Sequence, residues 1–219
     1  MSSTEDYRRD EVGGRSASAP PEDVRSLVEA CLAGGAAGEG AFTRLVTLFR
    51  DRVVSVAAGM LGDLDQAEDV AQEVFLKVHA NLGQFRFESR LESWLYRIAI
   101  RVSVDHTRRF WRRRRVGLER LPEAQRESAL AGAIAQEGRG HLGSNPETNA
   151  LRAEQARAVR QALREIPAAF RAAVVLKDMA DLPYEEIGRI LGCPLGTVES
   201  RIHRGRQALR KKLEKVLQT

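Results

Sequence analysis

Polar and basic side chains recur along a short stretch near the C-terminus, at spacings that place them on one face of a helix. The face consists of Thr197, Ser200, Arg201, His203 and Arg204. Guanidinium groups bind guanine edges and phosphates with paired hydrogen bonds, and hydroxyl groups bond to phosphates. The pattern therefore predicts a helix that enters the major groove of DNA, whereas the alternative is a helical hairpin with a basic exterior.

The elements that must position this face are predicted to form a helix-turn-helix. Its apolar residues recur at helical spacing on either side of a short turn: Ile187, Ile190, Leu191, Val198 and Ile202. Gly192 can adopt the left-handed backbone conformation that ends a helix, and Gly188 lets the two helices approach closely. Such a pair of helices crosses at a steep angle and holds its basic face outward.

A second set of cations occurs in the middle of the chain. Six arginines fall within 108–115, and Arg97 and Arg101 precede them. The apolar periodicity over 91–102 predicts a helix that continues into this cluster. Clustered cations favour a polyanionic partner, although a charge run can also be a solvated helix face.

Three long amphipathic helices are predicted in this part of the chain. Apolar residues recur at steps of three and four over 42–60, 67–78 and 91–102. Asp65 with Glu68, and Ser89 with Glu92, fit the capping-box pattern at the start of the second and third helices. Three helices with matching apolar stripes can close one small core.

The predicted fold class is all-α, with two small helical domains joined by a flexible linker. The chain divides into a disordered arm over 1–40, a first domain over 41–115, a linker over 116–149 and a second domain over 150–217. A short helix is possible in the arm over 23–32, before a glycine-rich break over 34–40. The linker is polar and too long for a loop within a compact domain.

Composition excludes several classes of protein. Cys31 and Cys193 lie too far apart for a zinc site, and the low cysteine count favours a reducing compartment. No apolar run reaches membrane-spanning length and the N-terminus lacks the apolar core of a secretion signal, so we expect a cytoplasmic protein. No nucleophile–base pair, phosphate loop or metal cluster is present, so we predict no enzyme activity, cofactor or metal.

Three segments resemble bacterial sigma factors, in particular the extracytoplasmic-function (ECF) group. LPYEEIGRILGCPLGTVESRIHRGRQAL (182–209) is similar to their C-terminal DNA-binding region. AEDVAQEVFLKV (67–78) is similar to their core-polymerase-binding helix, and WLYRIAIRVSVDHTRR (94–109) to their promoter-melting helix. The resemblance implies a two-domain sigma factor that binds core RNA polymerase and promoter DNA.

The resemblance also implies roles for individual residues. The five residues of the C-terminal face would read the −35 element. The residues that would bind the −10 element are Arg86, Phe87, Arg97, Arg101, Arg108 and Arg109. Asp69, Gln72 and Glu73 would dock on the polymerase, although without the resemblance a solvated face is the favoured interpretation of these side chains. Phe85 fits base capture and core packing equally well.

The chain departs from the family pattern at three positions. Arg101 stands where Asn is usual, which puts base choice at the −10 element in doubt. Glu199 stands where a basic residue is common, and it could accept a hydrogen bond from a cytosine amino group. Gly205 replaces a common Ala and is expected to loosen its helix by about 1 kcal/mol.

One alternative to a sigma factor is a free-standing helix-turn-helix regulator. A repressor would need a dimer interface or a ligand pocket in the first domain, whose motifs look instead like polymerase contacts. The resemblance further implies a stress or envelope response and an anti-sigma factor as an antagonist, for which the sequence itself shows no motif.

Overall fold

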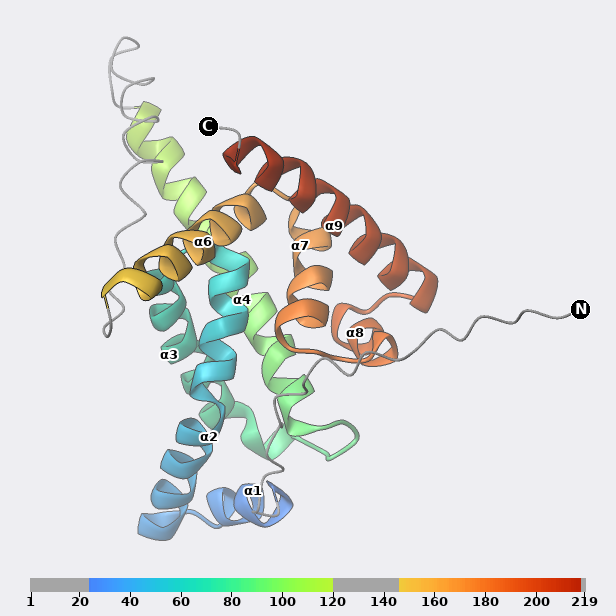
Figure 1. Cartoon of the computed structure of the whole chain (residues 1–219). Coiled ribbons are helices and arrows are strands. Elements are labelled where there is room, and N and C mark those ends of the chain that lie inside the picture. The colour runs from blue at the N-terminus through green and yellow to red at the C-terminus, as the bar shows by residue number, and fades with distance from the viewer. Residues whose placement is uncertain (1–23, 120–145, 218–219) are drawn as a thin grey trace, which may run out of the picture.

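The structure is a computed structural model that describes residues 24–119 and 146–217, with side chains over 24–112 and 155–214. The described residues contain helices and no strand, which confirms the predicted all-α class (Figure 1). The first group of elements is α1 (Val24–Ala33), α2 (Gly35–Leu61), α3 (Leu64–Asn81), the 3₁₀ turn η1 (Leu82–Gln84) and α4 (Leu91–Glu119). The second group is α6 (Pro146–Arg164), α7 (Ala168–Val174), the π-helical turn η3 (Val175–Met179), α8 (Tyr184–Leu191) and α9 (Leu195–Leu217).

Helices α2, α3 and α4 pack around the core of the first domain. Their predicted apolar stripes are buried, and the fully enclosed side chains include Leu45, Val53, Val56, Val70, Val74 and Leu95. Burying an aliphatic side chain contributes about 1.5–3 kcal/mol, so the stripes are sufficient reason for these helices to associate.

Residues 24–40 do not behave as a disordered arm. Helix α1 coincides with the short helix expected over 23–32, but the expected glycine break over 34–40 is wrong, because only Gly34 separates α1 from α2. Leu27 and Val28 of α1 are buried in the core. A Cβ atom at Gly38 would lie 3.1 Å from the carbonyl oxygen of Cys31, so this glycine permits α1 to pack closely on α2. The rest of the predicted arm, 1–23, lies outside the described residues.

The two predicted capping boxes are not formed. Asp63 caps α3 in place of Asp65, since its carboxylate accepts a hydrogen bond from the backbone N–H of Gln66 at 2.9 Å. An Asp at either position satisfies the sequence pattern, so the pattern alone could not choose between them. Glu92, expected to pair with Ser89, forms ion pairs with arginines on α2 and before α4 instead.

The second group of elements contains the predicted helix-turn-helix. Ile187, Val198 and Ile202 are fully or almost fully buried, as their spacing predicted. Gly192 ends α8 in the left-handed conformation at a φ of 61°. A Cβ atom at Gly188 would lie 2.9 Å from the carbonyl oxygen of Cys193, which confirms that a glycine is required where the helices meet.

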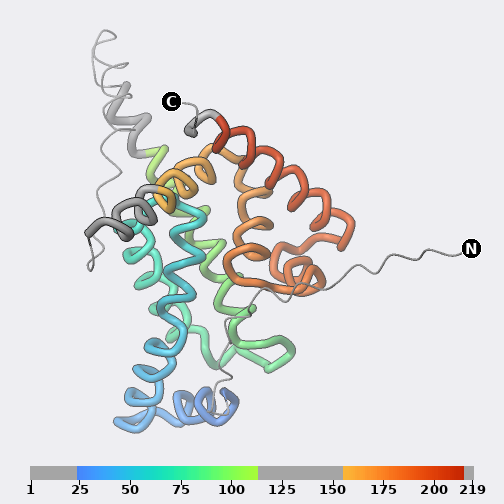
Figure 2. The backbone as a smooth tube through the Cα atoms, viewed as in Figure 1, coloured from blue at the N-terminus to red at the C-terminus, as the bar shows by residue number. Residues whose placement is uncertain are grey.

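The two groups pack against each other and share one hydrophobic core. The tube view shows α6 crossing the end of α2, and α8 lying beside α4 (Figure 2). Most of the predicted linker lies outside the described residues; its ends extend α4 to Glu119 and begin α6 at Pro146. In the part of the chain that the structure describes, no helix is long and apolar enough to span a membrane.

Candidate nucleic-acid interface

The outward face of α9 begins directly after the turn. Ser200, His203 and Arg204 are exposed on it, and Thr197 is half-buried. The Ser200 hydroxyl donates to the carbonyl oxygen of Thr197 at 3.0 Å. This bond leaves the lone pairs of the hydroxyl oxygen facing solvent, where they can accept a hydrogen bond.

The two arginines on this face have different surroundings. Arg201 is half-buried, and its Nη1 donates to the Cys193 sulfur in the turn at 3.5 Å. Arg204 is exposed and has no ion pair among the described residues. Arg201 is therefore suited to supporting the turn, and Arg204 to contacting an external partner.

Helix α4 carries the second cationic face. Arg97, Arg101 and Arg108 are exposed, and their spacing of four and seven residues places them on one side of the helix. Arg97 Nη2 donates to the carbonyl oxygen of Arg189 in α8 at 3.2 Å, so the second domain partly occupies this face. Arg109 lies elsewhere on the helix, because its Nη2 pairs with the carboxylate of Glu73 at 2.7 Å.

The loop before α4 forms an aromatic cluster. Phe85 is buried and its ring lies 4.8 Å from that of Phe87 and 5.4 Å from that of Trp94, measured between centroids. Phe87 is half-buried at a φ of 57°, a left-handed conformation that is uncommon for a bulky residue. The guanidinium of Arg25 in α1 lies 4.3 Å from the Phe87 ring centroid.

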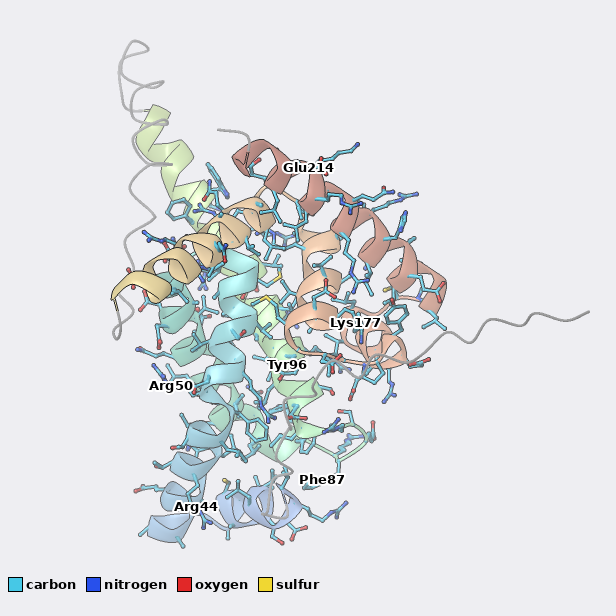
Figure 3. All side chains as sticks on the ribbon, in the orientation of Figure 1. Arg44, Arg50, Phe87, Tyr96, Lys177 and Glu214 are labelled. Carbon is cyan, nitrogen blue, oxygen red and sulfur yellow. The ribbon has the colours of Figure 1, made fainter. Side chains whose placement is uncertain are left out.

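This cluster places Phe85 in the core and shows that α1 is a neighbour of Phe87, which the sequence did not indicate. Phe85 is part of the core, whereas Arg86 is exposed at the tip of the loop. Helix α1 covers part of Phe87, the labelled ring near α1 in Figure 3. No sequence pattern links α1 to this loop, because the two are distant along the chain.

The outer side of α3 borders a groove shared with α2. The groove has a volume of about 570 Å³ and its lining is mainly apolar: Phe42, Val46, Arg50, Glu68, Ala71, Gln72, Phe75, Leu76 and His79. Leu76 is 72% exposed at the edge of this mainly apolar groove, so the two form a continuous exposed apolar surface. Asp69 and Gln72 are exposed beside it.

Glu73 is more constrained than the other two predicted docking residues. It is half-buried and pairs with Lys77 at 3.5 Å as well as with Arg109. Partial desolvation raises the pKa of Glu73, but the hydrogen bonds and charges of Arg109 and Lys77 outweigh it and hold the pKa below the usual range. The carboxylate therefore connects α3 to α4 inside the molecule.

Polar contacts also join the two domains. The Ser93 hydroxyl of α4 donates to the Glu186 carboxylate of α8, and both side chains are buried. Tyr96, labelled in Figure 3, is buried one turn further along α4. The Ser93–Glu186 pair was not predicted, since an acid in the first turn of a helix is ordinary on sequence grounds.

Arg171 of α7 fastens the second domain to the end of α2. Its guanidinium donates to the carbonyl oxygen of Met60, and to those of Arg164 at 2.7 Å and Ile166 at 2.9 Å. Burial, together with the charge of Arg164, lowers the pKa of Arg171 to about 10. The side chain stays charged at neutral pH, and the three carbonyl groups replace part of its lost hydration, while its buried Nε has no hydrogen-bond partner among the described residues.

Gly59, in α2, and Gly62, which directly follows α2, allow this close contact. A Cβ atom at Gly59 would lie 2.6 Å from the Met179 sulfur and 2.8 Å from Val175 Cγ2, both in η3. A Cβ atom at Gly62 would lie 3.0 Å from the carbonyl oxygen of Arg160. The domains therefore fit together through backbone surfaces that larger residues would hold apart.

The role expected for Gly205 needs correction. Gly205 is buried, and a Cβ atom there would lie 2.5 Å from Val174 Cγ2 and 3.1 Å from the carbonyl oxygen of Phe170. The glycine therefore lets α9 pack directly on α7. Its low helix propensity is offset by this packing, which the sequence could not show.

Comparisons with known proteins match each of the two helical domains to a family. Residues 45–113 match the family described as Sigma-70 region 2, and residues 156–209 match the family described as Sigma-70, region 4. The chain is 33% identical over 178 residues to the ECF RNA polymerase sigma factor SigW of Bacillus subtilis, covering 80% of this chain and 90% of that protein. It is 33% identical over 179 residues to the ECF RNA polymerase sigma-E factor of Escherichia coli K12, covering 81% and 88%.

A solved structure shares the fold. The sigma factor RpoE of Bartonella quintana, crystallised with the anti-sigma factor NepR, superposes with a TM-score of 0.60 at 22% identity, covering 79% of this chain and 96% of that one.

Proposed function

Since the chain belongs to the ECF sigma factors of the sigma-70 family, we propose that its first domain docks on core RNA polymerase and binds the −10 element while its second domain reads the −35 element. The observation that carries this proposal is the presence of two exposed cationic helix faces, on α4 and α9, in two domains of one chain. Sigma factors are transcription initiation factors and not enzymes. The free-standing regulator is disfavoured because the first domain matches sigma-70 region 2.

On α9 the roles divide according to side-chain surroundings. Arg204 contacts DNA directly, with Ser200 and His203 beside it. Arg201 and Thr197 hold the start of the helix against the turn, and Arg201 reaches DNA only in part. Glu199 is exposed next to this face, where it can accept a bond from cytosine but repels phosphates.

We predict that Arg204→Ala weakens polymerase-dependent binding at the −35 element by about 1–3 kcal/mol and relaxes preference at one base pair. If Arg204 meets only phosphate, binding weakens uniformly across sequences and the salt slope falls by about one. Binding measured on single-base variants of the −35 element at several salt concentrations separates the two cases. Arg201→Ala is the matched variant, with a smaller direct effect on DNA. Unchanged affinity and preference in both variants would contradict the assignment of α9.

On the first domain, Arg97, Arg101 and Arg108 track the DNA backbone at the −10 element, and Arg86 and Phe87 receive an unpaired base. Phe87 must then shed part of its cover, since Arg25 lies over its ring. Arg109 contributes less, because its guanidinium is engaged by Glu73.

Core polymerase docks on the α2–α3 groove. Leu76 supplies an apolar contact at its edge, and Asp69 and Gln72 supply polar contacts beside it. Glu73 contributes mainly to the structure of the domain, because its ion pair with Arg109 holds α4 against α3. An apolar centre with a polar rim is the usual composition of a protein interface.

We predict that Asp69→Lys combined with Gln72→Lys weakens binding to core polymerase about tenfold and leaves the fold unchanged, because both side chains are exposed. Binding of the labelled protein to purified core polymerase measures the effect. Glu29→Lys, an exposed charge reversal on α1, is the control and is expected to bind normally. Normal binding by the double variant would overturn the assignment of this surface.

With the two domains packed together, the protein is too short to bind the −10 and −35 elements of one promoter at the same time. About 25 base pairs separate the centres of the −10 and −35 elements, or about 85 Å at 3.4 Å per pair. Helix α2, with 27 residues, is about 40 Å long. Residues 120–145 would span about 90 Å if fully extended, so the length of the chain permits the domains to separate.

An anti-sigma factor completes the proposed set of partners, together with a role in a stress or envelope response. The support is the Bartonella quintana sigma factor, which has the same fold and was solved with such an antagonist. Co-purification of this chain with the products of neighbouring genes tests the partner. Unchanged activity after their deletion would count against it.

A further inference from the structure

Trp111 of α4 has no role in the function proposed above. It is 46% exposed, although tryptophan is normally well buried. It lies one turn beyond Arg108, and its spacing of 14 residues from Arg97 and three from Arg108 places it on the cationic face of the helix. The exposed tryptophan therefore continues the surface proposed to follow promoter DNA.

The surroundings of Trp111 suit a nucleobase flanked by phosphates. Thr107, Arg108, Trp111 and Arg112 line a surface groove of about 420 Å³, and no acidic residue lines it among the described side chains. The Phe110 ring meets the Trp111 ring edge to face, with centroids 5.8 Å apart and planes at 83°. This contact restrains the indole while the arginines stay exposed beside it.

We propose that Trp111 is a stacking platform for an unpaired base of promoter DNA, with Arg108 and Arg112 binding the phosphates on either side. Aromatic rings among cations are the usual means of binding single strands, because every base has a π-face. Bases in a duplex are already stacked on both faces, so the site takes single-stranded DNA. The proposal rests on the proposed function, since it extends the −10 surface by one helical turn.

Fluorescence of the full-length chain tests the site directly. In a Trp94→Phe background Trp111 is the sole tryptophan, because the chain has two. A 12-nucleotide oligothymidine is expected to quench its emission, whereas a duplex of the same length leaves most of it unchanged. Equal quenching by single strand and duplex would show a general cation effect and overturn the proposal.

Affinity measurements provide the second readout. Trp111→Ala is expected to lower affinity for the oligothymidine about tenfold, and Trp111→Phe to restore most of it. Leu48→Ala removes another exposed apolar side chain, on α2, and is the control. Unchanged affinity in Trp111→Ala would overturn the proposal.

Holoenzyme assays separate this proposal from the proposed function. Trp111→Ala is expected to bind core polymerase and −35 duplex normally but to hold a promoter with an unpaired −10 bubble less tightly. If the wild-type chain bound the oligonucleotide through Trp111 but selected no promoter with core polymerase, the proposed function would fail and the stacking site would stand.

Discussion

Glu186→Lys is expected to separate the two domains. The wild-type carboxylate is 6% exposed and accepts the Ser93 hydroxyl across the interface. A lysine at this position would bury an ammonium group against the Ser93 hydroxyl. None of the described contacts at this position would place a carboxylate beside the ammonium group. An uncompensated buried charge costs about 3 kcal/mol or more, which shifts the ratio of closed to open molecules about 100-fold.

Small-angle scattering measures this shift as an increase in the radius of gyration of the free protein. Transcription at limiting protein concentration is expected to rise, because the open state is the one that reaches both promoter elements. A gain of activity distinguishes domain opening from partial unfolding, which would lower it.

Glu185→Lys is the matched control, since it makes the same charge change at the neighbouring, exposed position of the same helix. It has the same unfavourable interaction with the helix dipole and none of the burial cost. An unchanged radius in Glu186→Lys, or an equal increase in both variants, would show that the Ser93–Glu186 contact does not hold the domains together.

Gly205→Ala is expected to destabilise the second domain, although alanine has the higher helix propensity. The gain of about 1 kcal/mol in propensity is smaller than the cost of overpacking, because the new Cβ atom would lie 2.5 Å from Val174 Cγ2. We expect a net loss of about 2 kcal/mol in the free energy of unfolding, or about 10 °C in Tm for a domain of this size. Thermal unfolding followed by circular dichroism measures it.

Two further variants identify the cause. Gly40→Ala, in α2, adds a Cβ atom with nothing within 4 Å and is expected to stabilise the protein slightly. Val174→Ala combined with Gly205→Ala removes the obstructing methyl groups, so the double variant is expected to lose less than the sum of its parts. A stabilising effect of Gly205→Ala alone would contradict the packing argument.

Local patterns in the sequence were enough to predict the main helices and the helix-turn-helix. Ile187, Val198 and Ile202 are buried as their periodicity predicted, and Gly188 and Gly192 occupy the positions that the turn requires. These features depend on residues close together in the chain, where helical spacing and backbone stereochemistry decide the structure. Motif resemblance added the family, which the comparisons confirm.

The tertiary structure decided which of the predicted binding residues are free to contact DNA or polymerase, and which are engaged inside the protein. Arg109 and Glu73 were predicted for different partners, but they pair with each other because α3 and α4 lie side by side. Gly205 looked unfavourable from propensity alone, and only the position of Val174 shows why it is needed.

The closed contact between the domains depends on residues far apart in the sequence, such as Ser93 and Glu186, and on the close fit of Gly59 against Val175. Hydrophobic periodicity shows that a helix has a face to bury. It does not show which surface will bury that face, because any apolar surface of matching shape reduces the exposed area equally well.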